Sequence, residues 1–122
     1  MFEVEIYSDK NNNCPIEDYI NELNQKAINS KKDRIILKKI LEYIKILERY
    51  RTRAGLPYMK YIQDDIWELR PIKDRIFFAY YKENTFLLLH YYKKKTRKAP
   101  QREIQKAIDN LKEYIARSEK NE

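Results

Sequence analysis

Cysteine is almost absent from this chain, and long apolar runs are missing. Cys14 is the only cysteine among 122 residues, which excludes an intramolecular disulfide and a metal site built from clustered cysteines. No apolar run approaches membrane-spanning length, and the chain begins with the alternating segment FEVEIY rather than with a charged region and an apolar stretch. We therefore expect a cytoplasmic protein without a membrane partner, in which Cys14 has no functional role.

The composition is that of a folded domain with a basic surface. Hydrophobic residues make up 43% of the chain and charged residues 37%, which argues against disorder and for a well-solvated exterior. The length suits one core, and no repeat or low-complexity linker divides it, so we expect a single domain over residues 1–122. The formal charge of +7 indicates a polyanionic partner only weakly. The positions of the cations along the chain must therefore decide whether such a partner is expected.

The N-terminal half predicts one strand and two helices. Alternation over residues 2–7 is typical of a half-buried strand, and Pro15 is well placed to open a helix that runs to about Asn29. Ser30 resembles the cap of a second, longer helix that ends near the basic residues 51–53. We expect these two helices to form a hairpin.

The C-terminal half predicts a sheet followed by a last helix. Segments 67–70, 75–81 and 85–92 are rich in aromatic and aliphatic residues and are separated by PIKD and KEN, which favours a three-stranded antiparallel meander. Pro100 opens a helix with an apolar stripe. The expected fold class is α+β, in the order β, α, α, β, β, β, α, with an antiparallel sheet, an N-terminal helical hairpin and a C-terminal helix.

Two arginines at the inner ends of the first hairpin are predicted to share one face of the sheet. With PIKD as a four-residue connection Arg70 lies across from Arg75, and opposite side chains in antiparallel strands point to the same side. A two-residue turn in the next hairpin pairs Phe77 with His90 and Arg75 with Tyr92. The predicted polar face comprises Arg70, Arg75, Phe77, His90, Tyr92 and Lys94. The predicted core face comprises Trp67, Leu69, Ile76, Phe78, Leu87 and Leu89.

Two facing arginines need compensation, because like charges opposite each other on a sheet cost a few tenths to about 1 kcal/mol. One source is a carboxylate such as Glu68, or solvent. The other is an anionic ligand, since the guanidinium fork matches phosphate oxygens. The segment HYYKKKTRKAPQR favours the ligand, because it joins cations to aromatic rings without an acid, as single-stranded RNA binding requires. The predicted RNA-binding residues are Tyr91, Tyr92, Lys93, Lys95, Arg97 and Lys98, although the last two also suit a solvated face.

The stretch WELRPIKDRIFFAYY, followed by LLLHYYKKKTRKAPQREIQKA, resembles the RelE/HigB superfamily of toxins from bacterial type II toxin–antitoxin systems, in particular its phage-derived HigB-like branch. The resemblance is strongest over residues 55–115. It implies a RelE-like, microbial ribonuclease-type fold and an mRNA endoribonuclease that works on the ribosome, inhibits translation and arrests growth. The implied reaction uses neither metal nor cofactor: the ribose 2′-hydroxyl attacks the adjacent phosphate, leaving a 2′,3′-cyclic phosphate and a 5′-hydroxyl.

The resemblance also assigns candidate catalytic residues. Arg70 and Arg75 match the phosphate-stabilising arginines of the family, Lys60 matches a basic position, and Lys93 and Lys94 match a lysine pair after the last strand. His90 is the only histidine, and it is the readiest proton carrier because histidine as a residue type has an unperturbed pKa near 6.5, although a lone histidine on a sheet is often structural. The general acid and base differ among relatives, so the catalytic candidates are Arg70, Arg75, His90, Lys94 and Lys60.

The family implies partners as well as chemistry. These are a cognate helix-turn-helix antitoxin of the HigA-like kind, mRNA on the ribosome, and operator DNA only indirectly through the antitoxin. Two alternatives fit the same basic face: a basic module that binds RNA or the ribosome without cleaving it, and a degenerate toxin that acts only as an antitoxin-bound corepressor. Binding alone does not separate them, because salt-sensitive association depends on charge and not on chemistry.

Overall fold

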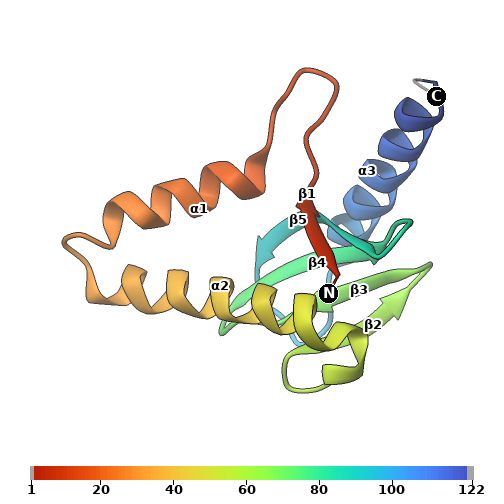
Figure 1. Ribbon diagram of the computed structural model, residues 1–122. Helices are drawn as coiled ribbons and strands as arrows, with labels where there is room; N and C mark the ends of the chain where they lie inside the picture. The colour runs from red at the N-terminus through yellow and green to blue at the C-terminus, as the bar shows by residue number, and fades with distance from the viewer. Residues whose placement is uncertain (1, 121–122) are drawn as a thin grey trace.

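The computed structural model describes residues 2–120 and shows a five-stranded mixed sheet with helices on both faces (Figure 1). The strand order is β1-β5-β4-β3-β2. Along the chain the elements are β1 (Glu3–Ile6), α1 (Pro15–Lys26), α2 (Lys31–Tyr50), the 3-10 turn η1 (Arg51–Ala54), β2 (Met59–Gln63), β3 (Ile66–Leu69), β4 (Asp74–Tyr80), β5 (Thr85–Lys93) and α3 (Gln101–Lys120). The predicted α+β class is confirmed, and the predicted order fits apart from one additional strand.

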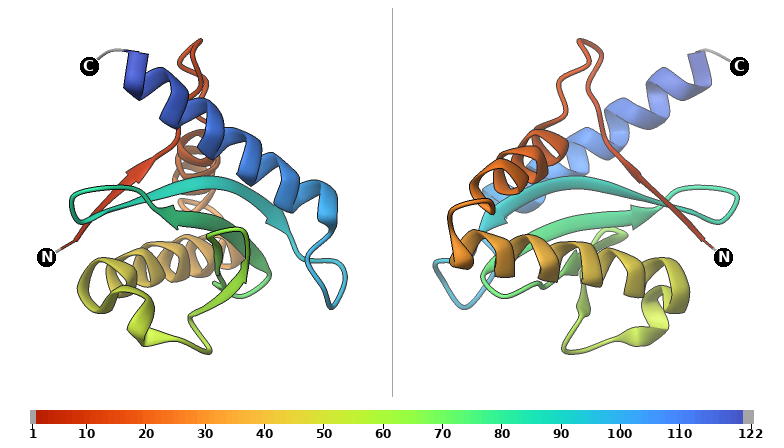
Figure 2. Two further views of the ribbon diagram at one scale, coloured as in Figure 1. Left: turned by 90° about the vertical axis from the view of Figure 1, so that its right-hand side faces the viewer. Right: turned by 60° about the vertical axis from the view of Figure 1, so that its left-hand side comes forward.

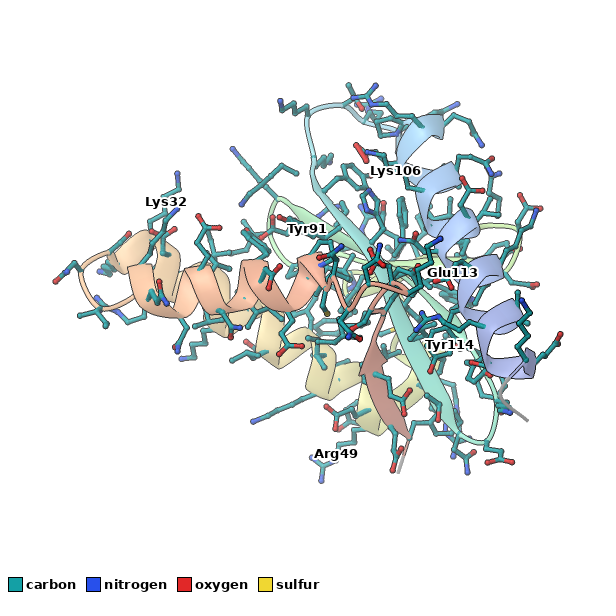
Figure 3. The ribbon with its side chains drawn as sticks, turned by 90° about the horizontal axis from the view of Figure 1, so that it is seen from above. Lys32, Arg49, Tyr91, Lys106, Glu113 and Tyr114 are labelled. Atoms are coloured by element: carbon teal, nitrogen blue, oxygen red, sulfur yellow. The ribbon has the colours of Figure 1, made fainter. Side chains whose placement is uncertain are left out.

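The helix starts follow local sequence signals. Pro15 occupies the first turn of α1, where its missing N–H costs nothing. Ser30 caps α2 as predicted, its hydroxyl oxygen accepting a hydrogen bond from the Asp33 N–H at 3.2 Å. The α2 helix ends at Tyr50, because Arg51 adopts a positive φ of 57°. The α1–α2 hairpin extends well beyond the sheet, with Lys32 near its tip (Figure 3).

The sheet differs from the predicted antiparallel meander in two ways. The first strand, β1, pairs in parallel with β5, so the sheet is mixed. The segment before the meander forms the edge strand β2, which pairs antiparallel with β3 and brings Lys60 opposite Glu68. The sequence pattern puts Lys60 only in a segment leading into the sheet, because a short edge strand with few buried side chains gives a weak pattern.

The β4–β5 ladder has the predicted pairs near the start of β4. Arg75 lies opposite Tyr92 and Phe77 opposite His90, as expected. Beyond Phe77 a β-bulge leaves Leu89 as an extra residue of β5. The carbonyl oxygen of Leu89 accepts a hydrogen bond from the Asn110 side chain of α3 at 2.8 Å, which satisfies a group that the ladder leaves unpaired.

The bulge overturns part of the predicted core face. Leu87 and Leu89 belong to a cluster on the α3 side, not to the face of Leu69 and Ile76. Phe77 is fully buried in the α3-side cluster as well. Both faces of the sheet are therefore apolar over most of their area, with α2 on one side and α3 on the other (Figure 2). The end of the sheet near the starts of β4 and α3 presents polar groups on the α3 side.

Candidate phosphate-binding cavity

A cavity of about 470 Å³ lies at this polar end of the sheet, and we call it the cation cavity. Its walls come from β2, the ends of β3 and β5, the start of β4, and the segment that leads into α3. It holds six cations and a single carboxylate among its lining residues. The charged lining residues are Lys60, Glu68, Arg70, Arg75, Lys94, Arg97 and Lys98.

Strand register explains why these side chains meet. Lys60 of β2 lies across from Glu68 of β3, and Arg75 of β4 lies across from Tyr92 of β5. Continuing the β3–β4 register from the Leu69–Ile76 pair puts Arg70 opposite Arg75, as the parity argument predicted. Opposite residues share a face, so three hairpin connections deliver the group to one side of the sheet.

Glu68 is the centre of the charged network, whereas the sequence alone suggests it only as a possible counter-charge. It is buried, at 4% exposure. Its Oε1 accepts a hydrogen bond from Arg70 Nη1 at 2.9 Å and lies 3.8 Å from Arg75 Nε. Its Oε2 accepts a hydrogen bond from the Tyr92 hydroxyl at 3.2 Å. The two arginines are thus partly neutralised from within the protein.

Arg75 is fixed by its backbone contacts as well. Its Nη1 donates to the carbonyl oxygens of Ile72 and Asp74, both at 2.9 Å, and its side chain is buried. Burial lowers the pKa of Arg75, the neighbouring Arg70 lowers it further, and Glu68 opposes both effects. A guanidinium group remains charged despite such a shift. Arg75 is therefore a rigid cation in the floor of the cavity.

Arg70 and Tyr92 complete the floor. The Arg70 side chain is one quarter exposed, so it reaches the open part of the cavity. The Tyr92 ring packs against Phe77, with centroids 5.4 Å apart. Burial raises the pKa of the Tyr92 phenol, and the adjacent Glu68 carboxylate adds to the rise. Tyr92 consequently keeps its proton at neutral pH and acts as a hydrogen-bond donor, with one ring face covered.

Two residues predicted to bind RNA lie on the other face of the sheet. Tyr91 stacks on Tyr19 of α1, with ring centroids 4.4 Å apart and an angle of 5°, and it lies beside α1 in Figure 3. Lys93 Nζ lies 3.0 Å from Oδ1 of the buried Asp74. Alternation along β5 turns both residues away from the cation cavity, whereas Tyr92 and Lys94 face it. The predicted stacking and phosphate roles of Tyr91 and Lys93 have no support from this placement.

His90 shares the polar face of β5 but lies outside the cavity lining. Its Nε2 is 2.7 Å from Oε1 of Glu103 in the first turn of α3. The hydrogen bond from His90 lowers the pKa of Glu103, against a smaller opposing effect of burial. This contact ties β5 to the start of α3. Of the remaining predicted residues, Lys95 is exposed and does not line the cavity, whereas Arg97 and Lys98 do.

The described part of the chain, residues 2–120, contains no group of three or more His, Cys, Asp and Glu side chains placed to hold a metal ion. In the same part, none of the helices is long and apolar enough to cross a membrane.

Comparison with known proteins identifies the family. The family described as "Phage derived protein Gp49-like (DUF891)" matches residues 18–112, which is most of the chain. The chain therefore belongs to this family, a RelE-like family of phage-derived, toxin-like proteins. The match covers every strand that contributes to the cation cavity. A comparison with curated proteins finds no match.

Proposed function

We propose that the protein is the toxin of a toxin–antitoxin system, of the HigB-like kind, and that it cleaves mRNA on the ribosome. The observation that carries the proposal is the convergence of Arg70, Arg75, Lys60 and Lys94 on one cavity large enough for a phosphodiester. Membership of a toxin-like family supports the same conclusion. Cleavage would inhibit translation and arrest growth, which is how such a toxin acts.

The reaction that suits the cavity is attack of the ribose 2′-hydroxyl on the adjacent phosphate. The 2′-oxygen bonds to phosphorus and loses its proton to a base, while the bond to the 5′-oxygen breaks and that oxygen gains a proton from an acid. The products are a 2′,3′-cyclic phosphate and a 5′-hydroxyl. Extra negative charge develops on the phosphate oxygens in between, and fixed cations such as Arg75 and Arg70 stabilise it.

The two proton transfers are assigned to Lys60 and Lys94. These side chains line the cavity from β2 and from the end of β5, on either side of the arginines. His90, the other candidate, is engaged by Glu103 and lies outside the lining. Replacing Lys60 or Lys94 by methionine should therefore lower cleavage more than replacing His90 by glutamine.

The test is cleavage of message by purified protein added to translating ribosomes. Wild-type protein should give discrete cuts with cyclic-phosphate ends, and Arg70→Ala should reduce them about 100-fold or more, the scale of losing one oxyanion-stabilising group. Arg102→Ala is the matched control, because Arg102 is exposed and does not line the cavity. Intact message with a folded wild-type preparation would reject the enzymatic proposal.

An antitoxin is the proposed protein partner. A toxin-like family implies one in general. A HigA-like helix-turn-helix protein encoded beside the gene is the specific candidate, with operator DNA reached through it. Co-expression of the protein with this antitoxin should suppress growth arrest and yield a complex that remains intact in gel filtration.

A second candidate function is binding of RNA or the ribosome without cleavage. The contact of Glu68 with both arginines favours it, because a partly neutralised pair is a weaker oxyanion site. Both candidates predict association that weakens with salt. Cleavage products separate them, since a binding module would protect message and leave it intact.

A further inference from the structure

Glu68 has no part in the proton transfers proposed above, yet it contacts three other side chains of the cation cavity. Donors from the turn after β3, from β5 and from β4 approach its two oxygens: Arg70 at 2.9 Å, Tyr92 at 3.2 Å and Arg75 at 3.8 Å. Lys60 lies across from it on β2. A buried carboxylate is costly unless it is paired and hydrogen-bonded, and Glu68 meets both conditions.

The shared oxygen Oε1 has a geometric consequence. Arg70 and Arg75 contact the same atom, so the carboxylate sets how far apart the two guanidinium groups lie and which edges they present. Without it the two cations would repel each other at the end of the hairpin. Arg75 also has its backbone contacts, whereas Arg70 has Glu68 as the ion-pair partner that the structure shows. Glu68 therefore governs Arg70 most strongly.

The negative charge of Glu68 opposes substrate binding, whereas its position holds the two arginines in place for the reaction. A phosphodiester that enters the cavity competes with Glu68 for the N–H groups of Arg70, so the carboxylate weakens binding of the ground state. Phosphate in mid-reaction carries more negative charge and competes better. A group that weakens ground-state binding while holding the cations in place favours the transition state over the substrate.

We propose that Glu68 is a positioning residue: it holds Arg70, Arg75 and the Tyr92 hydroxyl in one arrangement around the scissile phosphodiester, at the cost of weaker substrate binding. The inference rests on the function proposed above. It yields a specific signature, in which loss of the carboxylate tightens RNA binding and slows cleavage.

Two substitutions of Glu68 separate the effect of its charge from the effect of its side-chain length. Glu68→Gln keeps the length of the side chain and an acceptor oxygen but removes the charge. We expect it to bind a 2′-deoxy oligonucleotide several-fold more tightly than wild type and to cleave message about tenfold more slowly, the direction expected for misplaced catalytic groups. Glu68→Asp keeps the charge but draws the carboxylate back by one methylene. It should slow cleavage to a similar degree without tightening binding.

The chain offers a matched control in Asp74→Asn. Asp74 is also a buried carboxylate at this end of the sheet and also pairs with a cation, Lys93, but it does so on the opposite face. Glu68→Gln and Asp74→Asn each raise the net charge of the protein by one. A general electrostatic gain in RNA affinity would appear equally in both variants, whereas a local effect would appear only in Glu68→Gln.

The experiment measures binding of the 2′-deoxy oligonucleotide by fluorescence anisotropy, single-turnover cleavage on ribosomes, and folding by circular dichroism. Tighter binding with slower cleavage in Glu68→Gln, beyond any change in Asp74→Asn, supports the positioning role. Equal affinity in these two variants, or cleavage by Glu68→Asp at the wild-type rate, overturns it. If wild-type protein does not cleave, the proposed function fails, and the binding comparison still decides whether Glu68 competes with phosphate. Glu68→Asp keeps the test valid if Glu68→Gln does not fold.

Discussion

Two charged clusters lie on opposite faces of the same end of the sheet, and they differ in what each of them faces. The front cluster, Glu68, Arg70, Arg75 and Tyr92, faces the cation cavity. The rear cluster, Tyr19, Asp74, Tyr91 and Lys93, faces α1. Neighbouring residues of β4 and β5 contribute to both clusters, since Arg75 follows Asp74 and Lys93 follows Tyr92.

The charge balance of the clusters explains their different roles. At the rear one carboxylate meets one lysine, the Tyr19 hydroxyl donates to the same carboxylate at 2.9 Å, and the Tyr19 ring stacks on Tyr91. At the front one carboxylate meets two arginines and further lysines line the cavity. The rear cluster is balanced in charge and holds α1 to the sheet. The front cluster has an excess of donors, which an anion can satisfy.

The largest effect on cleavage should come from replacing arginine by lysine in the front cluster, compared with replacing lysine by arginine in the rear cluster. Arg75→Lys keeps the charge but loses the fork that contacts Ile72, Asp74 and Glu68 at once, so cleavage should fall about 100-fold. Lys93→Arg, the matched exchange at the rear, should leave cleavage unchanged. Single-turnover cleavage of ribosome-bound message measures both. Equal losses in the two variants would contradict the division into front and rear.

The next effect is on stability. Lys93→Met leaves the buried Asp74 carboxylate without its cation, so the free energy of unfolding should fall by about 1–3 kcal/mol. Urea denaturation measures it, and adding Asp74→Asn should restore part of the loss. Cleavage per folded molecule should stay near wild type. A stable Lys93→Met variant with weakened RNA binding would instead support the RNA-binding role that the sequence predicted for Lys93.

Tyr92→Phe removes one hydroxyl and keeps the ring. The variant loses the hydrogen bond to Glu68, which should lower the free energy of unfolding by about 1 kcal/mol and cleavage by less than Arg75→Lys does. Thermal denaturation together with the cleavage assay checks both parts. Unchanged stability would show that the Tyr92 hydroxyl does not support the buried carboxylate.

The effect that is smallest at neutral pH is a pH dependence in the rear cluster. Burial raises the pKa of Tyr19 from 10.0 to about 12; the Asp74 contact raises it too, while that of Lys93 lowers it. Because the folded-state pKa lies above the unfolded value, this contribution to stability is complete below pH 10 and is lost as pH rises through 12. Tyr19→Phe should therefore flatten the fall in stability over this alkaline window. Parallel curves for wild type and Tyr19→Phe in urea titrations would contradict the assignment.

The predicted pairing of Arg75 with Tyr92 was correct because two departures from the predicted β4–β5 register cancelled each other. The predicted register rests on a two-residue turn, but β4 ends at Tyr80 and β5 begins at Thr85, which shifts the pairing near the turn by one residue. The bulge at Leu89 shifts it back, so Arg75 still faces Tyr92. Leu87 and Leu89, between turn and bulge, changed faces. Bulges depend on tertiary partners such as Asn110, which no local pattern reveals.

Other features needed the three-dimensional structure. Alternation alone could have placed Tyr91 and Lys93 away from Tyr92, but the basic run obscured it. Glu68 could be weighed as a counter-charge, but its burial depends on β2, an edge strand that the pattern did not predict. The parallel pairing of β1 with β5 depends on a contact between chain segments some 80 residues apart, which propensity does not encode. Helix starts, by contrast, follow from Pro15 and Ser30 directly.

The most direct test of the central claim is a nuclear magnetic resonance titration of the protein with a 2′-deoxy oligonucleotide that cannot be cleaved. We predict that the side-chain N–H resonances of Arg70 and Arg75 shift, while the Tyr19 and Lys93 resonances on the rear face do not. Shifts confined to the rear face, or to α2, would show that the phosphodiester binds elsewhere and would contradict the account.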